Sequence, residues 1–157
     1  MADTRPSASR APTVSEESLL LDELRRMGYS RGGCFAVYFH LSNLQAPYRK
    51  PKFIRIAARA FDSLVANHDA TLYVLSTGNL ALICREVDIE YIDAAIFKLR
   101  ALFTDDPLTA DDSGDSFATW YDLSSSDDYA EFEQIAITLE AESQQRQGVV
   151  RRPGATA

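Results

Sequence analysis

The chain has 157 residues, of which 46% are hydrophobic and 25% charged, enough for one globular domain with its own core. Its 23 Asp and Glu residues outnumber 16 Lys and Arg, and the formal net charge of −7 opposes binding to nucleic acid or to an anionic membrane. No stretch is long and apolar enough to span a bilayer, and the first residues hold no signal-peptide core. We therefore expect a cytoplasmic protein with neither a nucleic-acid nor a membrane partner.

The N-terminal third predicts a tail, a helix and a buried strand. Residues 1–15 are rich in Ser, Ala, Arg and Pro, a composition typical of a disordered tail. Apolar residues at helical spacing then predict a helix that ends at Gly28; they are Leu20, Leu21, Leu24 and Met27. The nearly continuous apolar run of residues 34–41 (CFAVYFHL) predicts a central strand that is buried on both faces.

A helix, a hairpin and a second helix follow. Pro51 opens a helix whose apolar positions recur at helical spacing: Ile54, Ala57, Ala58, Phe61, Leu64 and Val65. Two β-rich runs, 70–75 and 80–85, flank the polar turn 76–79 and predict a hairpin. Asp88 is suited to cap the next helix, whose buried face holds Ile92, Ala95, Ile96, Leu99 and Phe103.

The last third predicts a strand and a closing helix. An acidic loop over 104–116 precedes the strand FATWYDL, and a helix capped by Ser126 carries Phe132, Ile135, Ala136 and Leu139. Residues 146–157 are polar and basic and include Pro153 and Gly154, which predicts a linker or a second disordered tail. The folded domain is therefore expected over 16–145.

The order of elements predicts the fold class. A helix, then βαββαβ, then a helix indicates an α/β (α+β) protein: a ferredoxin-like antiparallel sheet with additional N- and C-terminal helices. In that arrangement the strands 34–41 and 80–85 are antiparallel neighbours, which places His40 beside the turn 76–79. The same register brings Cys34 close to Cys84, and we expect two buried free thiols in a reducing cytoplasm.

One face of this sheet is left open by the two crossover helices. Tyr38 and Trp120 alternate with the residues expected to face those helices, so we expect both aromatic side chains on the open face. An exposed apolar face of that kind needs cover, either from the terminal helices or from a partner chain.

Two stretches of the chain carry a resemblance to a known family. They are Tyr38–Leu44 (YFHLSNL) at the end of the first strand and Ser76–Leu82 (STGNLAL) at the hairpin. Together with the element order over 34–145, they resemble the GGDEF domain, the nucleotide-cyclase-like fold of diguanylate cyclases in bacterial cyclic-di-GMP signalling. That family ends its first strand in F-[IL]-D-x-D-x-F and places G-G-D-E-F at the hairpin.

The chain departs from this family at the acidic positions. The family's metal-binding Asp falls on His40 and its second acid on Ser42, while the signature acids fall on Gly78 and Asn79. These residues lack the carboxylates that would hold divalent metals against a triphosphate. The resemblance therefore implies a degenerate GGDEF-like domain that is not an enzyme and needs no cofactor and no metal.

The resemblance also implies partners. Degenerate GGDEF-like domains commonly sit beside a cyclic-di-GMP phosphodiesterase (EAL) domain, so we expect contact with a protein partner or with a downstream EAL-like domain. Weak binding of GTP or cyclic-di-GMP and formation of a homodimer remain open. Asn43 matches a family position that contacts guanine.

A histidine, a turn with backbone N–H groups and a basic cluster each suit a phosphate group. The candidate nucleotide or anion site therefore consists of nine residues: His40, Asn43, Ser76, Thr77, Gly78, Asn79, Arg49, Lys50 and Lys52. The basic residues open a helix where the macrodipole disfavours positive charge, and a bound anion would compensate for this. The alternatives are a histidine that simply bonds a neighbouring loop, an ordinary turn and a solvated basic face.

A rival hypothesis is an enzyme with a relocated site. In it, His40 and the acidic loop form a phosphotransfer or hydrolase centre. The acids of this loop are Asp105, Asp106, Asp111, Asp112 and Asp115, and their spacing does not fit an EF-hand. A solvated loop explains the same residues.

Overall fold

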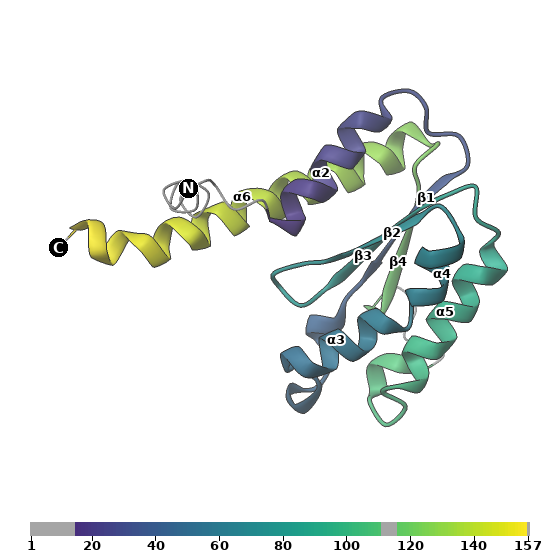
Figure 1. The fold of residues 1–157 in the computed structure, drawn as a ribbon, viewed down its shortest axis with the longest axis horizontal. Helices are drawn as coiled ribbons and strands as arrows, with labels where there is room; N and C mark the ends of the chain where they lie inside the picture. The colour runs from purple at the N-terminus through teal and green to yellow at the C-terminus, as the bar shows by residue number, and fades with distance from the viewer. Residues whose placement is uncertain (1–14, 111–115, 157) are drawn as a thin grey trace, which may run out of the picture.

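The computed structural model describes residues 15–110 and 116–156, with side chains described up to Arg146 (Figure 1). Its elements, in chain order, are the helix α2 (Glu16–Met27), strand β1 (Cys34–Phe39), 3₁₀ helices η1 (Leu41–Asn43) and η2 (Ala46–Arg49), helices α3 (Pro51–Arg59) and α4 (Asp62–Asn67), strands β2 (Ala70–Val74) and β3 (Leu80–Arg85), helix α5 (Ile89–Ala101), 3₁₀ helix η3 (Pro107–Thr109), strand β4 (Ala118–Asp122) and helix α6 (Ser126–Thr156).

The strands form one sheet in the order β2-β3-β1-β4, and every neighbouring pair is antiparallel. The mixed α/β class with a four-stranded antiparallel sheet, and the central place of β1, are therefore confirmed. Phe39 of β1 lies opposite Leu80 of β3, so His40 follows directly beside the hairpin turn, as the sequence predicts. Long apolar runs in β1 and β3 suit these two inner strands because both of their faces are covered.

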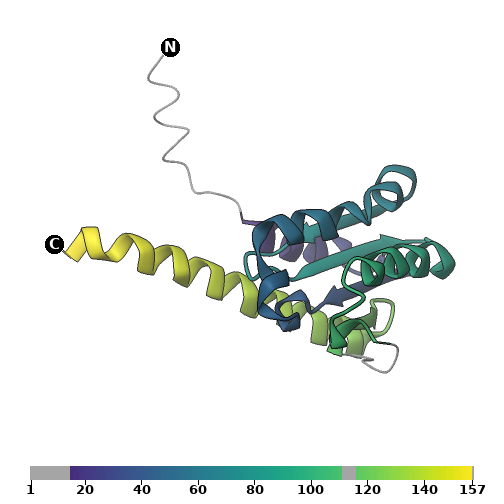
Figure 2. The same cartoon turned by 90° about the horizontal axis from the view of Figure 1, so that it is seen from below.

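Helices cover both faces of the sheet (Figures 1 and 2). The helices α3, α4 and α5 bury one apolar cluster, which includes Val37 and Phe39 of β1. The terminal helices α2 and α6 bury a second cluster, which includes Tyr38 of β1 and Phe132 of α6. The expected cover of the open face by the terminal helices is thus confirmed, and α6 continues beyond the sheet as a single helix to Thr156.

Trp120 lies on the other face from the one predicted. It stands directly opposite Val37 in the β1–β4 ladder, and Val37 packs under α3, α4 and α5. Directly opposed residues share a face, so Trp120 lies on that side and only Tyr38 lies under the terminal helices. The prediction fails because the register between β1 and β4 is set by contacts far apart in the sequence.

The predicted helix over 54–65 is interrupted. Helix α3 ends at Arg59, and α4 begins at Asp62 after a non-helical Phe61 with φ −101° and ψ 2°. The Phe61 ring is fully buried and packs 5.1 Å from the ring of Phe39. The interruption shifts the helical phase, so Leu64 stays in the core while Val65 turns outward.

The two cysteines are buried free thiols, as expected. They lie close together across the β1–β3 ladder, as predicted, but are offset by one position, because Cys34 lies opposite Arg85 and Cys84 lies opposite Phe35. Consequently Cys34 faces the terminal helices and Cys84 faces the opposite cluster.

In the part of the chain that the structure describes, no helix combines the length and the apolar composition that a membrane crossing requires.

Candidate functional site

The side chain of Asn79 joins the end of the hairpin to the end of β1. Its Oδ1 atom accepts a hydrogen bond of 2.8 Å from the backbone N–H of Ser42, and its Nδ2 group donates to the Tyr38 hydroxyl at 3.0 Å. The amide is buried, and burial raises the pKa of the Tyr38 phenol, so this hydroxyl stays neutral near pH 7. Asn79 therefore fills the junction with hydrogen bonds between neutral groups.

His40 is bound to the edge strand β4. Its Nε2 atom lies 2.8 Å from the Thr119 hydroxyl, and its backbone N–H donates to the carbonyl of Phe117 at 2.9 Å. The imidazole also meets the Tyr38 ring edge-on, with 4.9 Å between ring centroids. The half-buried histidine thus bridges β1 and β4, and a ligand role for it stays a prediction.

The hairpin turn is tied to both terminal helices through Ser76. The backbone N–H and the hydroxyl of Ser76 both donate to Oε2 of Glu17 in α2, at 2.8 and 2.6 Å. The guanidinium of Arg146 in α6 donates to the Ser76 hydroxyl at 2.5 Å. Glu17 is only 1% exposed, so a buried carboxylate faces the turn and a phosphate at Ser76 would meet like charge.

The remaining N–H groups of the turn are partly used within it. The N–H of Gly78 donates to the carbonyl of Leu75 at 2.9 Å, and that of Asn79 lies 3.4 Å from the Thr77 hydroxyl. Gly78 has φ +93°, a conformation that suits glycine, and a Cβ there would lie 3.8 Å from the side chain of Ile54. The turn therefore rests against α3 in a compact conformation.

The predicted basic residues lie on an exposed surface. Arg49 ends η2, Lys50 precedes α3 and Lys52 stands in the first turn of α3, which contains no acid. Among the described residues, no carboxylate oxygen lies within 4 Å of these three cations. Asn43 is also exposed, and its amide lies 3.4 Å from the carbonyl of Ser116. This surface offers positive charge to an anion.

The first acids of the acidic loop hold it to η2 and its neighbours. The buried carboxylate of Asp106 accepts from the backbone N–H groups of Gln45 and Leu108, at 2.8 and 3.0 Å. Asp105 accepts from the Tyr48 hydroxyl at 2.6 Å, and this hydrogen bond raises the pKa of Tyr48. The other predicted acids, Asp111, Asp112 and Asp115, lie outside the described residues. Within the described ranges, no cluster of three His, Cys, Asp or Glu side chains is arranged to hold a metal ion.

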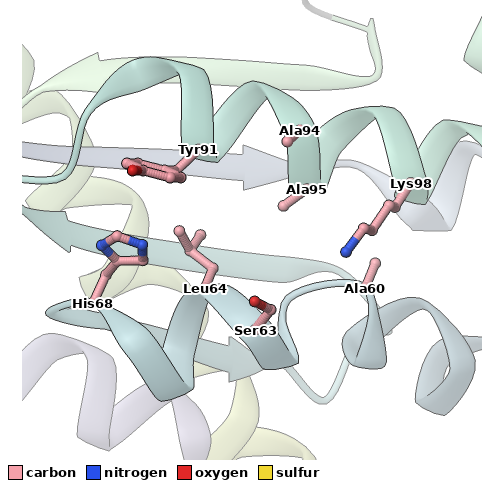
Figure 3. A pocket seen from close by; sticks show the side chains of 8 residues that line it. All are labelled: Ala60, Ser63, Leu64, His68, Tyr91, Ala94, Ala95 and Lys98. Atoms are coloured by element: carbon pink, nitrogen blue, oxygen red, sulfur yellow. The ribbon is translucent and has the colours of Figure 1, made fainter.

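Sequence reasoning did not find a small groove between α4 and α5 (Figure 3). The groove has a volume of about 90 Å³ and is lined by Ala60, Ser63, Leu64, His68, Tyr91, Ala94, Ala95 and Lys98. The rings of His68 and Tyr91 meet at one end in a tilted arrangement with 4.4 Å between centroids, and Lys98 lies at the other end, pointing toward Ala60 and Ser63. No motif in the sequence marks it, because the two helices meet only through the fold.

Comparison of the chain with models of known protein families, with curated proteins and with solved structures found no match. The function of the chain is therefore inferred from the geometry of the junction and of the basic surface.

Proposed function

We propose that this chain is a non-catalytic regulatory or interaction module, a degenerate GGDEF-like domain of bacterial cytoplasmic signalling. The observation that carries the proposal is the junction of Asn79 with Ser42 and Tyr38, which is built from neutral groups. At the equivalent place the resembled family holds divalent metals with carboxylates.

The architecture supports the comparison. The antiparallel order β2-β3-β1-β4, with one crossover between β1 and β2 and another between β3 and β4, is the order expected of a ferredoxin-like, nucleotide-cyclase-like domain. It brings the end of β1 beside the hairpin turn, where that family places its chemistry.

The electrostatics argue against cyclisation. Two nucleoside triphosphates carry a large negative charge, and metal ions held by acids normally offset it in phosphoryl-type transfers. At this junction the four equivalent positions are His40, Ser42, Gly78 and Asn79. The nearest described acid at the turn, Glu17, already accepts two hydrogen bonds from Ser76 and adds negative charge.

The proposed module binds a purine nucleotide weakly at the basic surface. Arg49, Lys50 and Lys52 are exposed cations, and Asn43 stands at the position that the resemblance associates with guanine. In this proposal the module acts through a protein partner or a downstream EAL-like domain, and a bound purine nucleotide adjusts that contact.

Incubation of the protein with GTP and Mg²⁺ or Mn²⁺, followed by chromatography, tests the absence of cyclase activity. Calorimetry with GTP and with cyclic-di-GMP, each with and without Mg²⁺, tests binding. Binding without turnover, or no binding at all, agrees with a non-catalytic module. Metal-dependent accumulation of cyclic-di-GMP that is lost in Asn79→Ala would refute the proposal.

A further inference from the structure

The two edge strands are capped by carboxylates from the helices beside them. On β2, the backbone N–H of Val74 points away from the sheet and donates to Oε1 of Glu16 at 3.2 Å. On β4, the backbone N–H of Asp122 donates outward to Oδ2 of Asp128 at 2.8 Å. Such caps remove outward donors that another strand would otherwise pair with.

The cap on β4 leaves two residues of the edge uncovered. In an antiparallel ladder the backbone N–H and C=O groups of successive residues point to alternate sides of the strand. The backbone groups of Ala118 and Trp120 therefore point outward from the sheet, as those of Asp122 do. Two backbone hydrogen bonds just beyond the ends of β4 fit this alternation, because both point inward to β1: the N–H of Leu123 donates to the carbonyl of Cys34, and the carbonyl of Phe117 accepts from the N–H of His40. Among the described residues, no acceptor bonds the N–H of Ala118 or Trp120 from outside the sheet.

Apolar side chains flank this open edge. Trp120 is 36% exposed and lies on the face covered by α5. The Arg100 guanidinium of α5 lies 4.6 Å from the ring of Phe117, which places that side of α5 next to β4. Ile89 and Phe97 lie roughly 20° and 60° from Arg100 around the helix, whereas Lys98 of the α4 groove lies about 160° away.

Phe97 is 74% exposed and Ile89 is half exposed, so this flank presents apolar surface that the monomer does not bury. An apolar strip beside an unpaired strand edge is typical of an interface rather than of a solvated surface.

We infer that β4 pairs antiparallel with β4 of a second copy of this chain, around a two-fold axis at Thr119. In that register Ala118 of one copy lies opposite Trp120 of the other, and the outward backbone groups form four hydrogen bonds. The small Ala118 side chain leaves room for the indole ring of the other copy. The blocked N–H of Asp122 is not needed, so the short ladder matches the uncovered part of the edge.

Charge complementarity favours this arrangement. Arg100 stands at the start of β4, where its guanidinium also donates to the carbonyls of Thr109 and Ala110, and Asp122 stands at the end of the strand. The two-fold axis places Asp122 of the second copy beside Arg100 on the same face of the joined sheet. Opposite charges therefore meet at both ends of the pair, which offsets part of the repulsion between two copies of net charge −7.

Sedimentation equilibrium over a wide concentration range tests the inference with two matched variants. Trp120→Arg alters the open edge, and Val74→Arg alters the capped edge at a residue of equal exposure, 36%. We expect the wild-type protein to dimerise, Trp120→Arg to weaken the dimer by about tenfold or more, and Val74→Arg to change it by less than about twofold. A wild-type protein that remains monomeric throughout, or equal weakening by both variants, overturns the inference.

Amide exchange on the wild-type protein avoids any effect of substitution on folding. The amides of Ala118 and Trp120 should exchange faster on dilution, whereas that of Leu72, which points outward from β2, should not change. Exchange that is independent of concentration at Ala118 and Trp120 contradicts the pairing.

A cysteine pair tests the register. Thr119 would face its symmetry mate in a non-hydrogen-bonded pair with Cα atoms about 4.5 Å apart, within the range of a disulfide. Mild oxidation should therefore cross-link Thr119→Cys and spare Asp122→Cys, whose mate would lie roughly 20 Å away along the strands. Cross-linking of Asp122→Cys in preference to Thr119→Cys would overturn this register.

Discussion

The buried side chain of Asn79 accepts a 2.8 Å hydrogen bond from the backbone N–H of Ser42, and so fastens the hairpin to the loop that follows β1. The two residues are separated by 37 positions in the chain, so the bond forms only when β1 and β3 are paired. This junction holds the end of the sheet and the loop after β1 together.

Replacement of Asn79 by Ala should destabilise the protein by about 2–3 kcal/mol, because one partly buried and one buried group would lose their hydrogen-bond partner. These groups are the N–H of Ser42 and the hydroxyl of Tyr38. Asn43→Ala is the matched control: this amide is exposed and makes one long contact, so a change within about 0.5 kcal/mol is expected. Urea unfolding followed by circular dichroism measures both, and equal effects would contradict the structural role of Asn79.

Replacement of Glu17 by Ala should cost about 2–3 kcal/mol, since Ser76 would lose the acceptor of two hydrogen bonds and a buried side chain would leave a gap. Amide exchange at Ser76 should also accelerate. Glu16→Ala removes only an exposed acceptor of the Val74 N–H and should cost less than about 1 kcal/mol. If the two substitutions cost the same, the contact between Glu17 and the turn does not anchor α2.

Local patterns predict most of the fold, and the failures occur where distant residues decide. Apolar periodicity identifies the strands and helices because each pattern is complete within its own segment. The interruption before α4 and the face of Trp120 have no such signal, because they depend on how Phe61 meets Phe39 and how β4 aligns with β1.

The candidate site shows the same limit. In the sequence Glu17 is one of several acids on an amphipathic helix and is indistinguishable from a solvated one. Its burial results from Ser76, which lies 59 positions away. The hairpin turn itself could be predicted from its polar composition. The hydrogen bonds that Ser76 in this turn donates to the Glu17 carboxylate could not.

The stability of the protein should fall as the pH rises above about 9. Burial, with a smaller contribution from the charge of Asp69, raises the pKa of the Cys84 thiol from 9.0 to about 12. The native state thus holds this proton more tightly than the unfolded chain. The resulting stabilisation is complete below the unfolded pKa and is lost as the pH rises toward 12.

Urea unfolding from pH 7 to 11 measures this dependence. Cys84→Ala should give a shallower decline than the wild type, while the raised pKa values of Tyr38 and Tyr73 persist in both proteins. Native Cys84 should also resist thiol reagents until the protein unfolds. Identical pH profiles for the two proteins would show that Cys84 does not contribute.

Charge reversal of Lys52 should affect stability and nucleotide binding in opposite directions. Lys52 stands in the first turn of α3, where the helix dipole favours an acid, so Lys52→Glu should stabilise the fold by about 0.3–1 kcal/mol. If the basic surface binds GTP as proposed, the same variant should bind GTP more weakly, and the difference from wild type should shrink at high salt. Lys98→Glu is the control, since Lys98 lies in the last turn of α5, where a cation is favourable. It should destabilise the fold by a similar amount and leave GTP binding unchanged. Thermal unfolding and calorimetry at two salt concentrations measure both effects, and equal loss of GTP binding in the two variants would show that overall charge, not the α3 surface, attracts the nucleotide.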